Sequence, residues 1–374
     1  MRTAIVSDLH LGLSNRGDIA RDPGVRRALL AEIGDADRVV LLGDIVELRE
    51  APIGPALAHA RPFFEELGAA LGDREVTIVP GNHDHRLAEP LLDALSLDGN
   101  PALGLEHGAD PGPGPSPTAT IAEWLGPVRL RIAYPGIWLR EDVYATHGHY
   151  MDPHLRIPRV ECLMLATLIR ISRPLPETAT AADYERLARP IYGFAYGVAQ
   201  ARRPSGRRRG NPSEAAWKVL VANDGVIGRG KRLRASAIRN GFPAGVWAAN
   251  RLLRSNFDAD VSGPSIFRHG LDAAAEMARR LGLDGVHLIN GHTHRPGPLA
   301  GEREWTLPGG GQLHNTGSWV FSPAFQIPDD PHNPYWPGVV TWVEESGPPR
   351  RVQVLADRDP AEMAALVGAT DHPG

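Results

Sequence analysis

The sequence of 374 residues has very little cysteine and no long hydrophobic run. Its single cysteine, Cys162, cannot form an intramolecular disulfide, which suits a reducing compartment. The apolar stretch 160–169 is interrupted by Glu161 and is much shorter than the ~20 residues that a membrane-spanning helix needs. The chain enters a strand-like segment at Thr3, which leaves no room for a signal peptide before it. We therefore expect a cytoplasmic protein, peripheral to a membrane at most.

The net charge of -4 conceals a strong asymmetry along the chain. Between His154 and Asn256 there are 19 Lys and Arg and 6 Asp and Glu, so this segment carries +13 and the remainder -17. The densest basic clusters contain Arg202, Arg203, Arg207, Arg208 and Arg209. One interpretation is a solvated loop, because Pro and Gly are interspersed. The other is recognition of an anion, which would be an anionic membrane surface, a lipid-linked phosphate or a nucleic acid.

Five short apolar segments each lead directly into side chains of the kind that bind metals. The segments are 3–6, 39–42, 76–79, 143–146 and 286–289. The candidate ligands that follow them are Asp8, His10, Asp44, Asn82, His147, His292 and His294. Because the carboxyl ends of neighbouring strands in an α/β sheet meet along one edge, these distant residues can share one site. Carboxylate, amide and imidazole ligands suit Mn²⁺, Fe, Zn²⁺ or Co²⁺, and the sequence does not select among them.

The order of these motifs resembles that of the calcineurin-like metallophosphoesterases. The matching blocks are Asp8-Leu9-His10, Gly43-Asp44, Gly81-Asn82-His83-Asp84, His147 and Gly291-His292-Thr293-His294. The resemblance implies an α/β fold, namely a four-layer α/β/β/α sandwich of two packed mixed sheets with a largely helical insertion. It also implies hydrolysis of a phosphate ester or pyrophosphate at a dinuclear centre of two divalent metal ions, Mn foremost, with a bridging hydroxide as the nucleophile.

The resemblance also assigns roles to individual residues. It gives one metal Asp8, His10, Asp44 and His294 as ligands, and the other metal Asp44, Asn82, His147 and His292, so that Asp44 bridges the two. His83 would contact the phosphate and protonate the leaving oxygen, and Asp84 would orient the His83 imidazole through a hydrogen bond. His149 has two open interpretations, a contact to His147 or to substrate, and a structural turn histidine.

The ligand blocks divide the chain into a core and an insertion. Residues 1–149 and 284–374 form the expected core, and residues 150–283 form a basic cap with helices near 159–172, 213–222, 235–254 and 270–282. The cap and the Gly-Asp-x-x-Glu motif at 43–47 resemble the UDP-2,3-diacylglucosamine diphosphatase branch, which implies an amphiphilic substrate. His83 and His149 depart from that branch, which commonly has Arg and Asp there. A nuclease or cyclic-nucleotide phosphodiesterase is the alternative, and a non-catalytic scaffold is a minor one.

Overall fold

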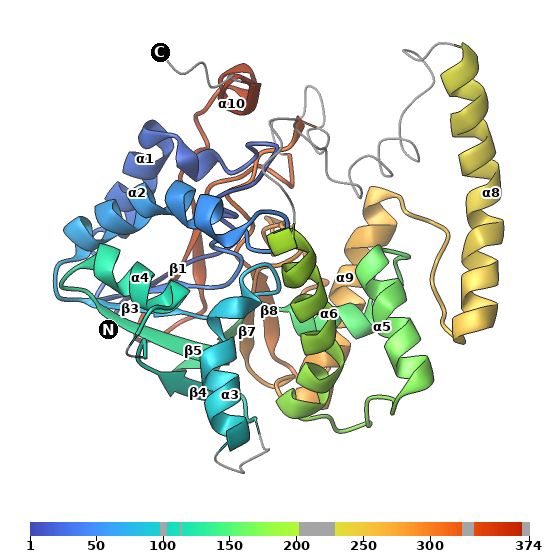
Figure 1. Cartoon of the computed structure of the whole chain (residues 1–374), viewed down its shortest axis with the longest axis horizontal. Coiled ribbons are helices and arrows are strands. Elements are labelled where there is room, and N and C mark those ends of the chain that lie inside the picture. The colour runs from blue at the N-terminus through green and yellow to red at the C-terminus, as the bar shows by residue number, and fades with distance from the viewer. Residues whose placement is uncertain (98–102, 113, 202–228, 324–332, 369–374) are drawn as a thin grey trace.

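A computed structural model describes residues 1–97, 103–112, 114–201, 229–323 and 333–368, with side chains omitted for 229–240 (Figure 1). The strands are β1 (Thr3–Val6), β2 (Arg38–Leu41), β3 (Glu75–Ile78), β4 (Glu106–Ala109), β5 (Arg129–Arg140), β6 (Val143–Thr146), β7 (His287–Asn290), β8 (Gln312–Asn315), β9 (Val339–Val343) and β10 (Arg350–Gln353). The helices are α1 (Pro23–Ile33), α2 (Ile53–Leu71), α3 (Glu89–Leu97), α4 (Pro117–Leu125), α5 (Val160–Ile171), α6 (Ala181–Ala201), α8 (Arg229–Leu253), α9 (Gly263–Leu281) and α10 (Pro360–Gly368). Short 3-10 helices occur at η1 (Ile19–Arg21), η2 (His85–Leu87) and η3 (His149–His154).

The strands form a mixed sheet in the order β10-β9-β1-β2-β3-β5-β6-β7-β8, with β4 paired to β5. The predicted α/β class with a helical insertion is confirmed. The two separate sheets that we expected are instead joined by hydrogen bonds through β5. Residues 129–132 of β5 pair with β3, and residues 136–140 pair with β6, because this strand is long enough to belong to both halves.

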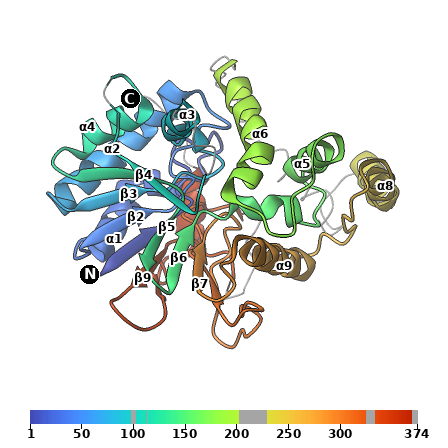
Figure 2. The same cartoon turned by 90° about the horizontal axis from the view of Figure 1, so that it is seen from below.

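Side chains of successive strand residues point to opposite faces, and both faces of this sheet are apolar. Ala4 and Val6 of β1 pack with α1, α2 and α4, which cover one side of the sheet (Figures 1 and 2). Ile5, between them, packs instead with Ile289 of β7, so the two halves of the sheet share an apolar interior. This packing fixes the carboxyl ends of β1, β2, β3, β6 and β7, which are the ends that precede the candidate ligands.

The segment from η3 to α9 consists of helices and connecting loops in its described part, and it lies beside β6 and β7 (Figure 2). Residues of α6 and α9, including Tyr184 and Met277, share one apolar cluster with Tyr144 and Leu288 of the strands. The predicted helices near 159–172, 235–254 and 270–282 are present as α5, α8 and α9. Helix α6 was not predicted, because Pro190 in its interior reads as a helix breaker.

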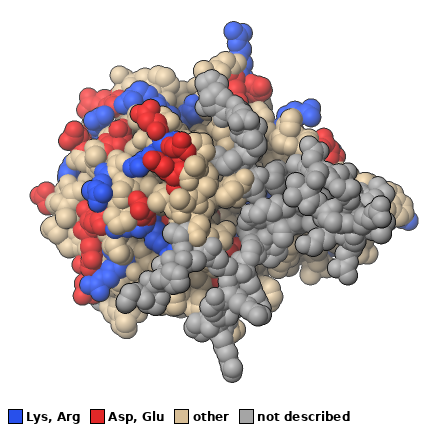
Figure 3. Space-filling model, turned by 90° about the horizontal axis from the view of Figure 1, so that it is seen from above, with Lys and Arg blue, Asp and Glu red and all other residues tan. Residues whose placement is uncertain are grey.

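Three observations bear on the predicted basic cap and on the predicted location of the protein. The predicted helix at 213–222 and the cluster Arg202–Arg209 lie outside the described residues. In the view of Figure 3, acidic and basic side chains are interspersed over the core, as is usual for a solvated surface. Among the described helices, none is both long and apolar enough to cross a membrane.

Candidate active site

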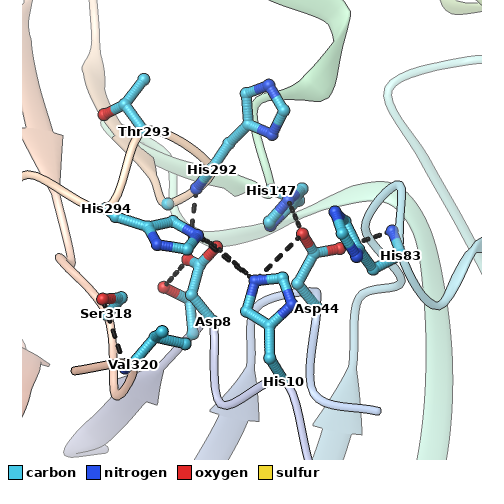
Figure 4. A network of polar contacts seen from close by, with 12 residues as sticks. Asp8, His10, Asp44, His83, His147, His292, Thr293, His294, Ser318 and Val320 are labelled. Atoms are coloured by element: carbon cyan, nitrogen blue, oxygen red, sulfur yellow. Dashed lines mark hydrogen bonds and ion pairs between the residues drawn. The ribbon is translucent and has the colours of Figure 1, made fainter. Parts of the chain in front are cut away.

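The structure brings all the predicted metal ligands together at one edge of the sheet, and Figure 4 labels all of them except Asn82. Asp8 and His10 follow β1, Asp44 follows β2 and Asn82 follows β3. The remaining ligands follow β6 and β7, and they are His147, His292 and His294. Asp8, Asp44 and His147 are completely or almost completely buried, whereas His294 lies on the more exposed side of the cluster.

The donor atoms fall into two neighbouring groups. In the first, His294 Nε2 lies 3.2 Å and His10 Nε2 lies 3.8 Å from Asp8 Oδ1. In the second, Asp44 Oδ2 lies 3.2 Å from His147 Nε2. Asp44 Oδ2 is also 3.6 Å from His10 Nε2, so this carboxylate reaches both groups. That position is the one expected for a bridging ligand.

The hydrogen bonds of three histidines show which ring nitrogen is free to bind a metal. His147 Nδ1 lies 3.0 Å from the carbonyl oxygen of Leu42, and His10 Nδ1 lies 3.0 Å from Glu47 Oε2. His292 Nε2 lies 2.7 Å from Asp152 Oδ1. An oxygen acceptor on one ring nitrogen places the proton there and leaves the other nitrogen with a free lone pair. In each of these rings, the free nitrogen faces the ligand cluster.

These ring nitrogens lie close to further polar groups, an arrangement that a cation satisfies. The side-chain amide of Asn82 has one atom 3.2 Å from His147 Nε2 and 3.1 Å from His292 Nδ1. Likewise, His10 Nε2 lies 3.2 Å from His294 Nε2. The residues therefore fit two divalent metal ions by donor type and by direction. Asp8, His10, Asp44 and His294 would hold one ion, and Asp44, Asn82, His147 and His292 would hold the other.

The backbone at the ligands is strained in a way that is typical of functional sites. Among the described residues, seven non-glycine residues have positive φ, and five of them are predicted ligands. These five are Asp8 (53°), His10 (46°), Asp44 (54°), His292 (66°) and His294 (61°). Close packing also requires glycine beside them, because a Cβ atom on Gly81 would lie 2.3 Å from Asp44 Oδ1. The fold therefore holds these side chains in place at the expense of local backbone energy.

The electrostatics of the cluster favour ionised carboxylates. Burial alone would raise the pKa of Asp44, but the neighbouring imidazoles of His147 and His83 outweigh it and hold this pKa well below its usual value. Asp44 is therefore an anion at neutral pH, as a bridging ligand must be. A buried anion of this kind requires compensating positive charge close by.

His83 lies beside the ligands, but the residue that orients it differs from our prediction. Its Nδ1 atom lies 2.7 Å from Glu47 Oε2, the same oxygen that contacts His10. Asp84 was expected to make this contact and does not. Its carboxylate instead accepts hydrogen bonds from the backbone N–H groups of Asp44, Ile45 and Gly81, which ties two ligand loops together. The reason is that Asp84 is buried beneath these loops, where their unpaired N–H groups need an acceptor.

His149, the residue with two open interpretations, is buried next to His147, and its ring also contacts that of Tyr192 in α6. Its ring centroid lies 5.7 Å from that of His147, and its Nε2 atom lies 3.2 Å from the hydroxyl of Tyr134. Burial holds the pKa of His149 well below its usual value. A neutral ring packed among aromatic residues matches the structural interpretation.

Two residues of the site were not found from the sequence. Glu47 was noted only as part of the Gly-Asp-x-x-Glu motif, whereas the structure shows it between His10 and His83. Asp152 lies in η3, 140 residues before its partner His292, and no sequence pattern connects the two. Residues that hydrogen-bond to metal ligands and orient them usually affect both the affinity for metal and the activity.

The α/β fold and the two groups of carboxylate and imidazole donors define the class of a metal-dependent hydrolase. A model of the calcineurin-like phosphoesterase family matches residues 1–296, which include every predicted ligand. The chain therefore belongs to the calcineurin-like phosphoesterase family and is an enzyme that acts on phosphoester bonds. No curated protein matches the sequence.

The solved structures that match the chain include two phosphatases. One is a dimetal phosphatase from Danio rerio, at 14% identity and a TM-score of 0.33, with 95% of this chain and 99% of that chain covered. The other is a point mutant of a cold-active protein tyrosine phosphatase, at 14% identity and a TM-score of 0.30, with 96% and 79% covered. Both scores are too low to support an argument, so the assignment rests on the family model and on the site.

Proposed function

We propose that the chain is a phosphohydrolase with a dinuclear metal centre that cleaves phosphate esters or pyrophosphates carrying an amphiphilic leaving group. The observation that supports the metal centre is the pair of donor groups around Asp8 and Asp44, in each of which the carboxylate and imidazole ligand atoms lie within 4.8 Å of one another. Divalent ions held there supply positive charge that polarises the phosphoryl group and activates water as a nucleophile. Mn²⁺ is the ion that we expect to support the highest rate.

The chain's own residues would do three further things. His83, with Nδ1 held by Glu47, presents its other ring nitrogen for proton transfer to the leaving oxygen. Glu47 keeps His83 and His10 in fixed orientations, because one carboxylate oxygen contacts both rings. Asp84 joins the loops that carry Asp44 and Gly81, so their ligands move as one unit.

The support for an amphiphilic substrate is a groove between α3 and α6. It is a cavity of ≈ 440 Å³ whose lining includes Leu92, Leu95 and Leu103. A smaller cavity lined by Asn82 and His83 shares Glu89 and Gly193 with it. Because the two cavities are neighbours, an apolar chain attached to a phosphate at the metal centre would extend toward this groove. In this proposal the cap selects the substrate, and the resemblance to the UDP-2,3-diacylglucosamine diphosphatase branch stays a prediction.

Phosphate release tests the activity and the substrate class together. The purified chain, loaded in turn with Mn²⁺, Fe²⁺, Zn²⁺ or Co²⁺, is assayed on p-nitrophenyl phosphate, bis-p-nitrophenyl phosphate, methyl phosphate and octyl phosphate. We expect a higher kcat/KM for octyl than for methyl phosphate. Absence of hydrolysis with every metal would refute the proposed activity, and equal values for the two alkyl esters would refute the amphiphilic substrate.

A matched pair of variants on α3 tests the groove itself. Leu95→Glu places a charge in the groove and should reduce kcat/KM for octyl phosphate about tenfold, with little change for methyl phosphate. Leu97→Glu is the control, because Leu97 is 86% exposed on the same helix and does not line the groove. Equal effects of the two variants would contradict the role of the groove.

A further inference from the structure

A small cavity adjoins the ligand cluster on the side that faces the cap. It has a volume of ≈ 50 Å³, and its lining includes Asn82 and His83 from the core and Tyr192 from α6. Arg49, which follows the Glu47 loop, also lines it. A space of this size accommodates a few water molecules or the oxygens of a phosphoryl group. The cavity is thus the point at which the cap meets the metal centre.

Tyr192 lines this cavity, and its hydroxyl is buried and has no hydrogen-bond partner among the described residues. Buried tyrosine hydroxyls normally find a partner, and others at the boundary between core and cap do so. Tyr134 and Tyr150, for example, both donate to Glu185. An unpaired polar group that is held in a closed site destabilises the fold and therefore calls for an explanation.

The position of the Tyr192 ring is fixed by its neighbours. Its centroid lies 5.1 Å from that of His85 and 5.5 Å from that of His149, so the phenol cannot turn freely toward another partner. Burial, followed by the negative charges of Asp152 and Glu185, raises the pKa of Tyr192 far above its usual value. The hydroxyl is therefore protonated at any physiological pH and available to donate a hydrogen bond.

Arg49 supplies a second donor in the same cavity. Its side chain is largely buried and pairs with Glu161 of α5, which fixes its direction. Arg49 Nη1 also lies 3.1 Å from the side-chain amide of Asn82, which places the guanidinium beside the ligand cluster. A guanidinium has five N–H donors in a rigid fork, and this geometry suits phosphate oxygens.

We propose that Tyr192 and Arg49 bind the phosphoryl oxygens of the substrate, so that helix α6 of the cap contributes a residue that contacts the reacting group. The inference rests on the proposed function, because it places a phosphoryl group at the ligand cluster. It gives the cap a part in the reaction itself, in addition to selecting the leaving group. The same two donors would hold inorganic phosphate, which shares the tetrahedral oxyanion.

Two substitutions on one helix separate this role from a structural one. Tyr192→Phe removes only the unpaired hydroxyl, and we expect it to weaken binding of inorganic phosphate by ~10-fold, as the loss of one hydrogen bond to a charged group would. It should lower kcat/KM for p-nitrophenyl phosphate by a similar or larger factor, while thermal stability is unchanged or higher. Tyr184→Phe is the control, because its hydroxyl lies 2.7 Å from His154 Nε2, away from the cavity. This variant should lose stability and keep both phosphate affinity and turnover.

Phosphate binding is measured by calorimetry on the metal-loaded full chain, independently of turnover. The inference is overturned if Tyr192→Phe binds phosphate and hydrolyses ester as well as the wild type does. It is also overturned if the wild type binds no phosphate. A third outcome separates the two proposals. If the wild type hydrolyses no ester, but binds phosphate more tightly than Tyr192→Phe does, the proposed function is contradicted and the phosphate-binding role of Tyr192 is supported. Arg49→Lys keeps the charge and removes the fork, so it should raise KM more than it lowers kcat. An unchanged KM in Arg49→Lys would exclude the guanidinium from substrate binding.

Discussion

A buried ion pair between core and cap leads to our most detailed prediction. His85 Nε2 of η2 lies 2.7 Å from Glu185 Oε1 of α6, and both side chains are almost completely buried. Glu185 also accepts hydrogen bonds from the hydroxyls of Tyr134 at 2.6 Å and Tyr150 at 2.8 Å. The second nitrogen of His85 faces Glu89 at 3.4 Å. The pair therefore joins the cap helix to the core through charge and hydrogen bonds.

The pKa values of His85 and Glu185 give the size and the sign of the stabilisation that this ion pair provides. Burial alone would lower the pKa of His85, but Glu185 and Glu89 outweigh it and raise this pKa from 6.5 to about 9. Burial would raise the pKa of Glu185, but His85 outweighs it and lowers this pKa from 4.5 to about 2. Each of these pKa shifts corresponds to roughly 3 kcal/mol of stabilisation of the folded state. The two shifts describe the same ion pair, so their free energies are not added.

The pH dependence follows from these directions. A histidine whose pKa is raised on folding contributes its full stabilisation below pH 6.5 and loses it as the pH rises through about 9. The Glu185→Gln variant should therefore be less stable than the wild type by roughly 3 kcal/mol at pH 6, and this difference should shrink to under about 1 kcal/mol at pH 10. Denaturant unfolding followed by tryptophan fluorescence gives both values. A difference that stays constant between pH 6 and pH 10 would refute the ion pair.

Three further predictions concern the site and the core. Asp44→Asn should leave less than half of the wild-type metal content, because one substitution weakens both donor groups; full metal content by mass spectrometry would disprove the bridging assignment. Glu47→Gln should lower kcat about 10–100-fold through misplacement of His83 and His10, and the loss should exceed the change in KM; wild-type kcat would exclude this role. Phe64→Ala should reduce the free energy of unfolding by about 3–5 kcal/mol, because Phe64 is fully buried beneath the sheet; a loss below about 1 kcal/mol in denaturant would show that the core repacks.

The sequence was most informative where a ligand directly follows a strand. Asp8, Asp44 and His147 could be placed at one edge because the ends of neighbouring strands must meet there. The α/β class followed from the same alternation of segments. The continuity of the sheet could not be predicted, because it depends on the pairing of one long strand, β5, with different neighbours in its two halves.

Contacts between distant segments account for the remaining differences. The family resemblance implied that Asp84 orients His83, but burial turns Asp84 toward the backbone, and Glu47 reaches the ring from another loop. Asp152 and Tyr192 come from the segment after the fourth ligand block, where no repeated pattern indicates which residues face the metal centre. Helix α6, which carries Tyr192, forms despite its internal proline because one face of it is buried against the core.

The metal content and activity of the wild-type chain test the central claim most directly. The protein is stripped with a chelator, titrated with Mn²⁺, and followed by metal analysis together with phosphate release from p-nitrophenyl phosphate. The two donor groups around Asp8 and Asp44 predict that activity is lost on chelation and returns in full only when about two ions per chain are bound. Full hydrolysis by the metal-free chain, or by a chain that holds a single ion, would contradict the account.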